Sequence, residues 1–341
     1  MMKPLVKRAV AARRLRARRL PALRASAADG TATVYYLCPD FSVPSGGIRA
    51  IYRHVDLLNA EGVPAAVLHH KDGFACTWFE HRTRIASASS VCLGRDDVLV
   101  VPEIYGPFLD ELPAEPRLVA FNQNAYLTFD RVPSGRRVPY ERFAAALTVS
   151  NDSADYLRFA FPGLPVSVAS NAIDPSVFRP ADAPPGRRIA VMPRKRPDDA
   201  NQVLRLLGDR LRDWEVVTIA GGSERDTAAA MRAASIFLAF GHQEGFGLPP
   251  AEAMASGCFV IGFPGFGGRE IFDPAFSIPI EDGDVLAFAR AVADTLERFE
   301  RDPGGVREAG LRASEHVRRT YPLDRQRTEL LSFMEDVRAC A

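Results

Sequence analysis

Residues 236–257 read IFLAFGHQEGFGLPPAEAMASG. The first five are apolar and mostly aromatic or β-branched, which predicts a short buried strand. Pro249 and Pro250 suit the first turn of a helix, where a missing N–H is tolerated, and Gly257 suits its end. The segment therefore predicts a strand, a glycine-rich turn and a helix, which together form the repeating unit of a parallel α/β sheet.

The same alternation extends in both directions along the chain. In the first half, apolar runs predict strands at 33–38, 63–68, 98–101, 118–121 and 147–150. In the second half, strands at 188–192, 215–220, 236–240 and 259–262 alternate with helices at 198–211, 225–234, 287–299, 305–319 and 323–337. Buried runs that alternate with helices are typical of parallel sheets. Such sheets bind ligands at the carboxyl ends of their strands, so we expect two α/β domains that aim these ends at a central cleft.

Prolines mark the boundary between the two sets of strands. Residues 161–186 contain Pro162, Pro165, Pro175, Pro180, Pro184 and Pro185. We therefore expect a basic leader over 1–28, an N-terminal Rossmann-like domain over 29–165 and a C-terminal one over 166–320. A last helix over 321–341 is expected to pack back on the N-terminal domain.

Composition excludes several classes of protein. The chain has 341 residues, 47% of them hydrophobic and 25% charged, which is typical of a globular protein. Nine of its 43 Lys and Arg lie in residues 1–28, which leaves 34 basic against 42 acidic side chains in the body. This acidic balance argues against nucleic-acid binding. Five scattered cysteines without a CxxC pair argue against a disulfide framework or zinc site and favour a reducing compartment. No apolar run is long enough to cross a membrane.

The leader has two readings. Residues 3–24 mix Leu, Val and Ala with Arg in a loosely helical pattern, and residues 1–28 contain no acid. A basic amphipathic helix can lie on an anionic membrane surface, whereas a solvated leader needs no partner. Arg13 and Arg14 interrupt the apolar residues, which argues against a secretory signal.

The turn in the opening segment carries groups that suit a sugar diphosphate. Gly245 and Gly247 let the backbone approach a ligand closely. The helix after them presents free N–H groups and the positive end of its dipole, which together bind anions. Glu244 precedes this helix and Glu252 lies in its early turns, and carboxylates accept hydrogen bonds from sugar hydroxyls. A strand–turn–helix with a favourable first-turn acid is the structural alternative.

A basic turn follows the strand at 188–192. It consists of Arg194, Lys195 and Arg196, and Lys195 is one of only four lysines in the chain. A departing diphosphate needs positive charge, which these side chains can supply. A solvated basic turn is the alternative, but the presence of the glutamate segment in the same chain favours phosphate binding by Arg194 and Lys195.

The residues from Glu244 to Ala255, with glutamates eight apart, resemble the Glu-x7-Glu signature of the retaining GT-B glycosyltransferases of family 4. Residues 171–174 with 178–180 resemble the interdomain segment of that family, residues 45–47 its glycine loop, and residues 148–150 its strand before the linker. The resemblance covers about residues 31–320. It implies a GT-B architecture, in which two Rossmann-like doubly wound domains face a central cleft, with the acceptor on the N-terminal side and the nucleotide sugar on the C-terminal side.

The resemblance also implies roles for single residues. Glu252 holds the ribose hydroxyls, and Glu244 contacts the transferred sugar. Arg194 and Lys195 act with Glu244 in catalysis. The donor-binding residues are then Gly245, Phe246, Gly247, Leu248, Gly46, Gly47 and Arg196. The family usually spaces its Arg and Lys five or six residues apart, whereas Asp199, Ala200 and Asn201 occupy the later positions in this chain. The roles within Arg194, Lys195 and Arg196 therefore stay open.

Two further turns are weaker candidates. Asn122, Gln123 and Asn124 follow a predicted strand, where they can bind sugar hydroxyls or satisfy their own turn. Gly267 and Gly268 form a second glycine turn after the strand at 259–262. No Asp-x-Asp metal motif occurs in a suitable place, so we expect neither a metal nor a cofactor.

The sequence thus predicts an enzyme that transfers a sugar, with retention, from a nucleotide-diphosphate donor to a glycan or lipid-linked acceptor. A GT-B epimerase or hydrolase, and a non-catalytic sugar-binding subunit, are the alternatives. We expect no nucleic-acid partner and a cytoplasmic protein, with peripheral contact to an anionic membrane through residues 1–24 as an option. Arg-rich, Lys-poor composition suggests a GC-rich bacterial source and a place in polysaccharide biosynthesis.

Overall fold

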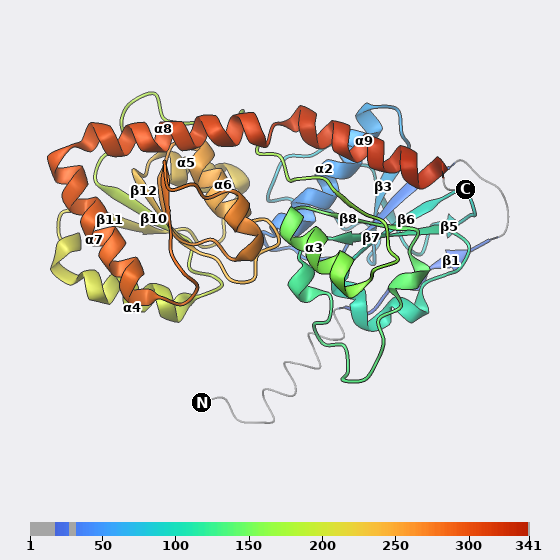
Figure 1. Ribbon diagram of the computed structural model, residues 1–341. Coiled ribbons are helices and arrows are strands. Elements are labelled where there is room, and N and C mark those ends of the chain that lie inside the picture. The colour runs from blue at the N-terminus through green and yellow to red at the C-terminus, as the bar shows by residue number, and fades with distance from the viewer. Residues whose placement is uncertain (1–17, 27–31, 340–341) are drawn as a thin grey trace. The chain divides into compact units, whose positions relative to one another are not determined.

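A computed structural model of the protein describes residues 18–26 and 32–339 (Figure 1). Contacts divide the chain into two units. Unit 1 consists of the residues up to Ala169 and those from Glu329 onward, and unit 2 consists of Ser170–Thr328. The division falls inside the proline-rich segment, four residues after the predicted boundary at 165.

The described part of unit 1 contains a seven-stranded parallel sheet in the order β4-β3-β2-β6-β7-β8-β9. Its strands are β2 (Val34–Leu37), β3 (Ala65–His69), β4 (Ile85–Ser87), β6 (Val98–Pro102), β7 (Arg117–Asn122), β8 (Ala145–Thr148) and β9 (Val166–Val168). Its helices are α2 (Gly46–Ala60), α3 (Asn151–Ala160) and the short 3-10 turns η1 (Glu103–Glu111), η2 (Ala125–Leu127) and η3 (Tyr140–Arg142). The long apolar runs form the inner strands as predicted. The edge strands β4 and β9, of three residues each, are too short to show a pattern.

Residues 18–26 lie along unit 1, although they fall within the predicted leader. Arg24–Ala25 forms strand β1, which pairs with β5 (Cys92–Leu93). Leu20 and Leu23 pack against the core of unit 1. Neither reading of the leader holds for residues 18–24: they form no helix, since Pro21 lacks an N–H, and they are not a solvated tail, since the two leucines pack against the body of the unit. The rest of the predicted amphipathic segment lies outside the described residues.

The described part of unit 2 contains a five-stranded parallel sheet in the order β11-β10-β12-β13-β14. Its strands are β10 (Arg188–Val191), β11 (Glu215–Thr218), β12 (Ile236–Phe240), β13 (Phe259–Phe263) and β14 (Ser277–Pro279). Its helices and 3-10 turns are α4 (Pro197–Leu207), η4 (Gly208–Leu211), α5 (Glu224–Arg232), α6 (Leu248–Ala255), η5 (Phe266–Glu270), α7 (Val285–Arg301) and α8 (Pro303–Thr320). On α7, the buried residues Phe288, Val292, Leu296 and Phe299 recur at helical spacing and join the core around the sheet.

The last helix, α9 (Leu323–Ala339), begins in unit 2, and its residues from Glu329 onward belong to unit 1. Its buried face consists of Leu330, Phe333, Met334 and Val337. In unit 1, the Arg117 guanidinium on β7 donates to the carbonyl of Val337. None of the helices in the described residues combines the length and the apolar character that crossing a membrane requires.

Candidate active site

Three loops meet at the carboxyl edge of the sheet in unit 2. Residues 192–196 follow β10, residues 241–247 follow β12, and residues 264–268 follow β13. These strands are neighbours in the order β10-β12-β13. The structure therefore brings the basic turn, the first glutamate and both glycine turns together, as parallel-strand geometry predicts.

An ion pair joins two of these loops. Lys195 Nζ donates to Glu244 Oε2 at 2.6 Å. The Lys195 side chain is 31% exposed and the Glu244 side chain 17% exposed, so the pair lies at the surface of the edge and is reachable from solvent. Lys195 can therefore exchange Glu244 for an anionic group of a ligand, and Glu244 can exchange Lys195 for a cationic one.

The two glycine turns pack backbone against backbone. The N–H of Gly267 donates to the carbonyl of Glu244 at 2.9 Å. A Cβ at Gly267 would lie 2.5 Å from the carbonyl carbon of Gly245 and 2.9 Å from the carbonyl oxygen of Glu244. Gly247 has φ 94°, a left-handed conformation that favours glycine, and stands against Gly268. Gly267 and Gly268 therefore support the glutamate loop from behind.

Helix α6 starts with unused hydrogen-bond donors. Within the described residues, no protein group accepts from the backbone N–H groups of Gly245, Phe246, Gly247 and Leu248. The Phe246 ring is buried and stacks edge-on against Tyr321, with centroids 5.1 Å apart, so its backbone rather than its side chain is available. Unpaired N–H groups at a helix N-terminus form an anion site. Glu252 is 4% exposed and lies in the second turn of this helix.

The three basic residues after β10 have different surroundings. Arg196 is held by protein groups: Nε donates to the carbonyl of Gly241 at 3.0 Å, Nη1 to Asp199 at 2.9 Å, and Nη2 contacts His242 and Asp282. Its guanidinium also lies over the Phe263 ring. Arg194 is exposed and makes no hydrogen bond or ion pair with the described residues. Arg196 thus ties the loop at 241–242 in place, and Arg194 and Lys195 remain as the accessible cations.

A second set of candidates meets at the carboxyl edge of the sheet in unit 1. Gly46 and Gly47 begin α2, and Gln123 Nε2 donates to the carbonyl of Gly47 at 3.1 Å. Asn122 is buried and donates to Thr128 and Tyr140. Asn124 caps its own turn by accepting from the N–H of Tyr126. Of the three amides, Gln123 is the one placed beside the glycine loop.

A buried acid at the same edge escaped the sequence analysis. Glu103 directly follows β6, and its Oε2 accepts from the N–H of Gln123 at 3.1 Å. Burial raises the pKa of Glu103 from its usual 4.5 to about 7, against the opposing effect of this N–H. The signal available in the sequence was its position, since an acid at the carboxyl end of a parallel strand lies where ligands bind.

Replacing Glu103 with glutamine should stabilise the protein, more so at alkaline pH. The folded state holds the proton more tightly than the unfolded chain, so the contribution of the carboxyl to stability is full below about pH 4.5 and is lost as pH rises through about 7. Glutamine stays neutral throughout. We expect the gain in free energy of unfolding to be roughly 2 kcal/mol larger at pH 8 than at pH 5. Urea unfolding at the two pH values measures it, with Glu111→Gln, an exposed acid at the end of η1, as control. An equal gain at both pH values would contradict this prediction.

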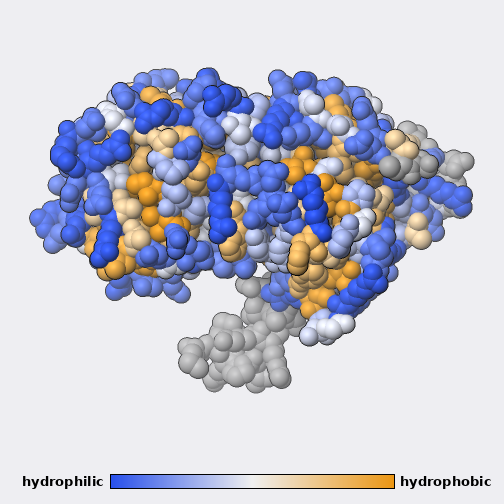
Figure 2. Space-filling view, in the orientation of Figure 1, coloured by the Kyte–Doolittle hydropathy of each residue, from blue (hydrophilic) through white to orange (hydrophobic). Residues whose placement is uncertain are grey.

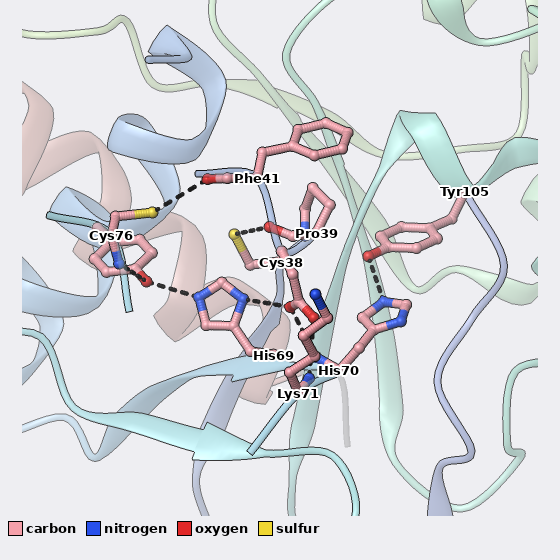
Figure 3. A network of polar contacts seen from close by, with 10 residues as sticks. Cys38, Pro39, Phe41, His69, His70, Lys71, Cys76 and Tyr105 are labelled. Atoms are coloured by element: carbon pink, nitrogen blue, oxygen red, sulfur yellow. Dashed lines mark hydrogen bonds and ion pairs between the residues drawn. The ribbon is translucent and has the colours of Figure 1, made fainter. Parts of the chain in front are cut away.

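Figure 3 shows a polar network where β2 and β3 end. The Asp40 carboxylate accepts three hydrogen bonds, from His69 Nδ1 and from the backbone N–H groups of His70 and Lys71, each with an N···O distance of 3.0 Å. The hydroxyl of Tyr52 lies 2.7 Å from His69 Nε2. Burial lowers the pKa of His69, although Asp40 opposes this shift. A neutral His69 that donates from Nδ1 and accepts from Tyr52 satisfies every one of these contacts. The network fixes residues 38–41, which lead to the glycine loop at 46–47.

Solved structures with the same arrangement identify the fold. Sucrose-phosphate synthase from Thermosynechococcus elongatus matches with a TM-score of 0.68 at 13% identity, over 91% of this chain and 100% of that chain. HepE from Anabaena, solved in complex with UDP and glucose, matches with a TM-score of 0.64 at 11% identity, over 89% of this chain and 100% of that chain. The fold is GT-B. The predicted α/β class with two parallel doubly wound sheets is thereby confirmed.

Sequence comparison finds similarity in part of the chain. Residues 189–298 match the family model described as "Glycosyl transferases group 1". This range contains Lys195, Glu244, Glu252 and Gly267. The alpha-1,6-glucosyltransferase of Actinobacillus pleuropneumoniae serotype 7 (strain AP76) is 28% identical over 216 residues, which cover 60% of this chain and 64% of that protein. The match thus spans less than two thirds of the length of this relative.

Proposed function

We propose that the protein is a glycosyltransferase that moves a sugar from a nucleotide-diphosphate donor to a glycan or lipid-linked acceptor. The observation that carries this proposal is the Lys195–Glu244 ion pair next to the unpaired N–H groups of residues 245–248. One short edge thus offers cations and N–H donors for phosphate and a carboxylate for sugar hydroxyls. The family match over residues 189–298 and the UDP and glucose held by HepE support it.

In this proposal the donor binds across the loops of unit 2. The diphosphate accepts hydrogen bonds from the N–H groups that precede α6 and attracts Lys195 and Arg194. Glu252 accepts hydrogen bonds from the ribose hydroxyls, and Glu244 accepts hydrogen bonds from hydroxyls of the transferred sugar. The phosphate competes with Glu244 for Lys195, so donor binding releases the Glu244 carboxylate at the moment when the sugar arrives. Gly46 and Gly47 in unit 1 serve the donor, and Gln123, which donates to the Gly47 carbonyl, is the candidate there for sugar hydroxyls.

In the chemical step, the positive groups of the site stabilise the negative charge that develops on the leaving diphosphate. The bond between the anomeric carbon and the phosphate oxygen breaks, and negative charge grows on the leaving diphosphate, where Lys195, Arg194 and the N–H groups stabilise it. The acceptor hydroxyl attacks the anomeric carbon on the same face, and its proton passes to the departing phosphate oxygen. This order gives retention and needs neither a metal nor a covalent intermediate.

A donor screen tests the function. We name UDP-glucose as the first candidate, because the curated relative is called a glucosyltransferase and HepE was solved with UDP and glucose. We expect UDP-glucose to raise the melting temperature of the protein more than GDP-, dTDP- or ADP-sugars do, and its glucose to appear in an added glycan or lipid-linked acceptor. Release of free glucose without an acceptor would instead indicate a hydrolase, an altered sugar on the nucleotide an epimerase, and binding without any turnover a binding subunit.

Replacing Lys195 with alanine should lower kcat about 100-fold, because one positive charge is removed from the developing diphosphate. KM should change less, since Arg194 and the N–H groups still bind the ground state. Steady-state kinetics with the donor found in the screen measure both constants. The matched control is Arg290→Ala, which removes an exposed cation on α7. A kcat that stays within twofold of the wild-type value would assign the charge to Arg194 instead.

A further inference from the structure

Hydrogen bonds tie together three loops at the carboxyl edge of the sheet in unit 1. Glu103 follows β6, Gln123 follows β7, and Gly47 lies at the start of α2, the helix after β2; these three strands are neighbours in the sheet (Figure 1). Glu103 Oε2 accepts from the backbone N–H of Gln123 at 3.1 Å, and Gln123 Nε2 donates to the carbonyl of Gly47 at 3.1 Å. A Cβ at Gly47 would lie 3.3 Å from the Gln123 amide, so these two loops are in close contact. Glu103 thus holds the glycine loop through Gln123.

The Gln123 side chain keeps an acceptor for a ligand. It is partly exposed, its nitrogen serves Gly47, and among the residues that the structure describes none donates to its oxygen, Oε1. The amides on either side are used within the protein, since Asn122 donates to Thr128 and Asn124 caps its own turn. An amide oxygen accepts hydrogen bonds from hydroxyls but offers nothing to the oxygens of a phosphate. Gln123 Oε1 therefore suits a sugar hydroxyl.

Glu103 destabilises the fold when it is ionised. It is 6% exposed, whereas hydrophilic side chains cover much of the face shown in Figure 2. Burial raises its pKa to about 7, and Arg18, which is held in an ion pair by Asp130, opposes this shift. Burial, and to a lesser extent the charge of Glu103, raises the pKa of Tyr140, which faces the same carboxyl. A glutamine would accept the same N–H without carrying a charge, so folding alone does not account for an acid at this position.

We propose that Glu103 is a positioning residue for sugar transfer, which fixes the backbone of Gln123 so that Gln123 Oε1 meets a sugar hydroxyl and the glycine loop keeps its place. This inference rests on the proposed function. The carboxylate is the effective form, because a charged acceptor holds an N–H more strongly than a neutral one does. Protonation weakens the hold on Gln123 and, through it, the order of the loop at Gly47.

The pH dependence of the Glu103→Gln variant tests this role. Glutamine resembles the protonated acid, so kcat/KM of the variant should lie within about twofold of the wild-type value at pH 6 and be about tenfold lower at pH 8. Other groups that titrate in this range act on both proteins and cancel in the ratio. The matched control is Glu111→Gln, an exposed acid on the same 3-10 helix, which should follow the wild type at both pH values. A variant-to-wild-type ratio that is the same at pH 6 and pH 8 would overturn the proposal.

A double-variant cycle tests whether Glu103 acts through Gln123. Gln123→Ala removes the side chain that reaches Gly47 and keeps the backbone N–H. In that background, Glu103→Gln should change kcat/KM at pH 8 less than about twofold, compared with about tenfold when Gln123 is present. Effects that simply multiply would show that Glu103 acts by another route and would refute its positioning role.

Hydrogen exchange without any donor separates this inference from the proposed function. Glu103→Leu keeps a buried side chain of similar size but offers no acceptor. It should speed exchange at the amide of Gln123 at least about tenfold and at residues 49–51, in the first turn of α2, at least about threefold, with α3 unchanged. Unchanged exchange at both places would overturn the inference even in an active transferase. Faster exchange in a protein that turns over no donor would support the hold of Glu103 on the loops and refute the proposed sugar transfer.

Discussion

Replacing Glu252 with alanine is expected to weaken the binding of a UDP-sugar about 1000-fold. In the proposed complex this carboxylate accepts hydrogen bonds from two ribose hydroxyls. A hydrogen bond to a charged group contributes about 1.5–3 kcal/mol. Losing two such bonds at a site that is 4% exposed gives a loss of this size. Glu252→Gln keeps the shape and accepts neutral hydrogen bonds of about half the strength, so it should lose roughly 30-fold.

Isothermal titration calorimetry measures both affinities. The matched control is Glu297→Ala, which removes an exposed acid on α7 of the same unit and should bind the donor like the wild type. Because Glu252 is buried, the melting temperature of each variant must accompany its affinity. A folded Glu252→Ala protein with wild-type affinity would remove Glu252 from the donor site and leave it as a structural acid of α6.

Replacing Gly267 with alanine is expected to remove the activity almost completely. The new Cβ would lie 2.5 Å from the carbonyl carbon of Gly245, so one of the two turns must move. Overpacking of this kind costs about 3 kcal/mol, which for a unit of this size lowers the melting temperature by about 10 °C. The displaced turn carries Glu244 and the N–H donors, and a 1 Å displacement alone costs about 100-fold in rate. We therefore expect a loss of about 1000-fold in kcat/KM.

Gly186 offers the matched control. It belongs to the same unit, and a Cβ there would meet nothing within 4 Å. Gly186→Ala should keep both the melting temperature and the kcat/KM of the wild type. Scanning calorimetry and donor turnover, measured on both variants, test the prediction. A Gly267→Ala protein that is destabilised but fully active at low temperature would show that the turn at 266–268 supports the fold and not the donor loop.

Sequence reasoning succeeded where long apolar runs and strand ends decide the outcome. The inner strands of both sheets bury both faces, so β3, β6, β12 and β13 read as continuous apolar runs. Parallel pairing then places the loop with Lys195 beside the loop with Glu244, although the two residues are 49 positions apart. The sequence could predict a shared edge but not the ion pair itself, which depends on side-chain directions.

What the sequence could not distinguish are residues whose neighbours come from distant parts of the chain. Arg194 and Arg196 are the same residue type two positions apart. Arg196 is nevertheless held by Asp282 and His242, and no local sequence pattern predicts these contacts. Likewise, Asn122 and Gln123 are neighbouring amides, but Asn122 donates to the Tyr140 hydroxyl in the core whereas Gln123 donates to the carbonyl of Gly47. Glu103 was overlooked because a single acid after a strand has no motif around it.

The path of α9 reverses the order in which the two units can be completed during synthesis. Unit 2 is one continuous stretch, Ser170–Thr328, and every residue it needs has been made when the chain reaches Thr328. Unit 1 begins earlier but takes its last part from Glu329 onward, including the Val337 carbonyl that binds Arg117, 220 positions before it. Domains generally fold as units as the chain emerges. On the ribosome, unit 1 is therefore completed only after unit 2 has been translated in full. Until then, the apolar surface of unit 1 that α9 covers stays exposed to water.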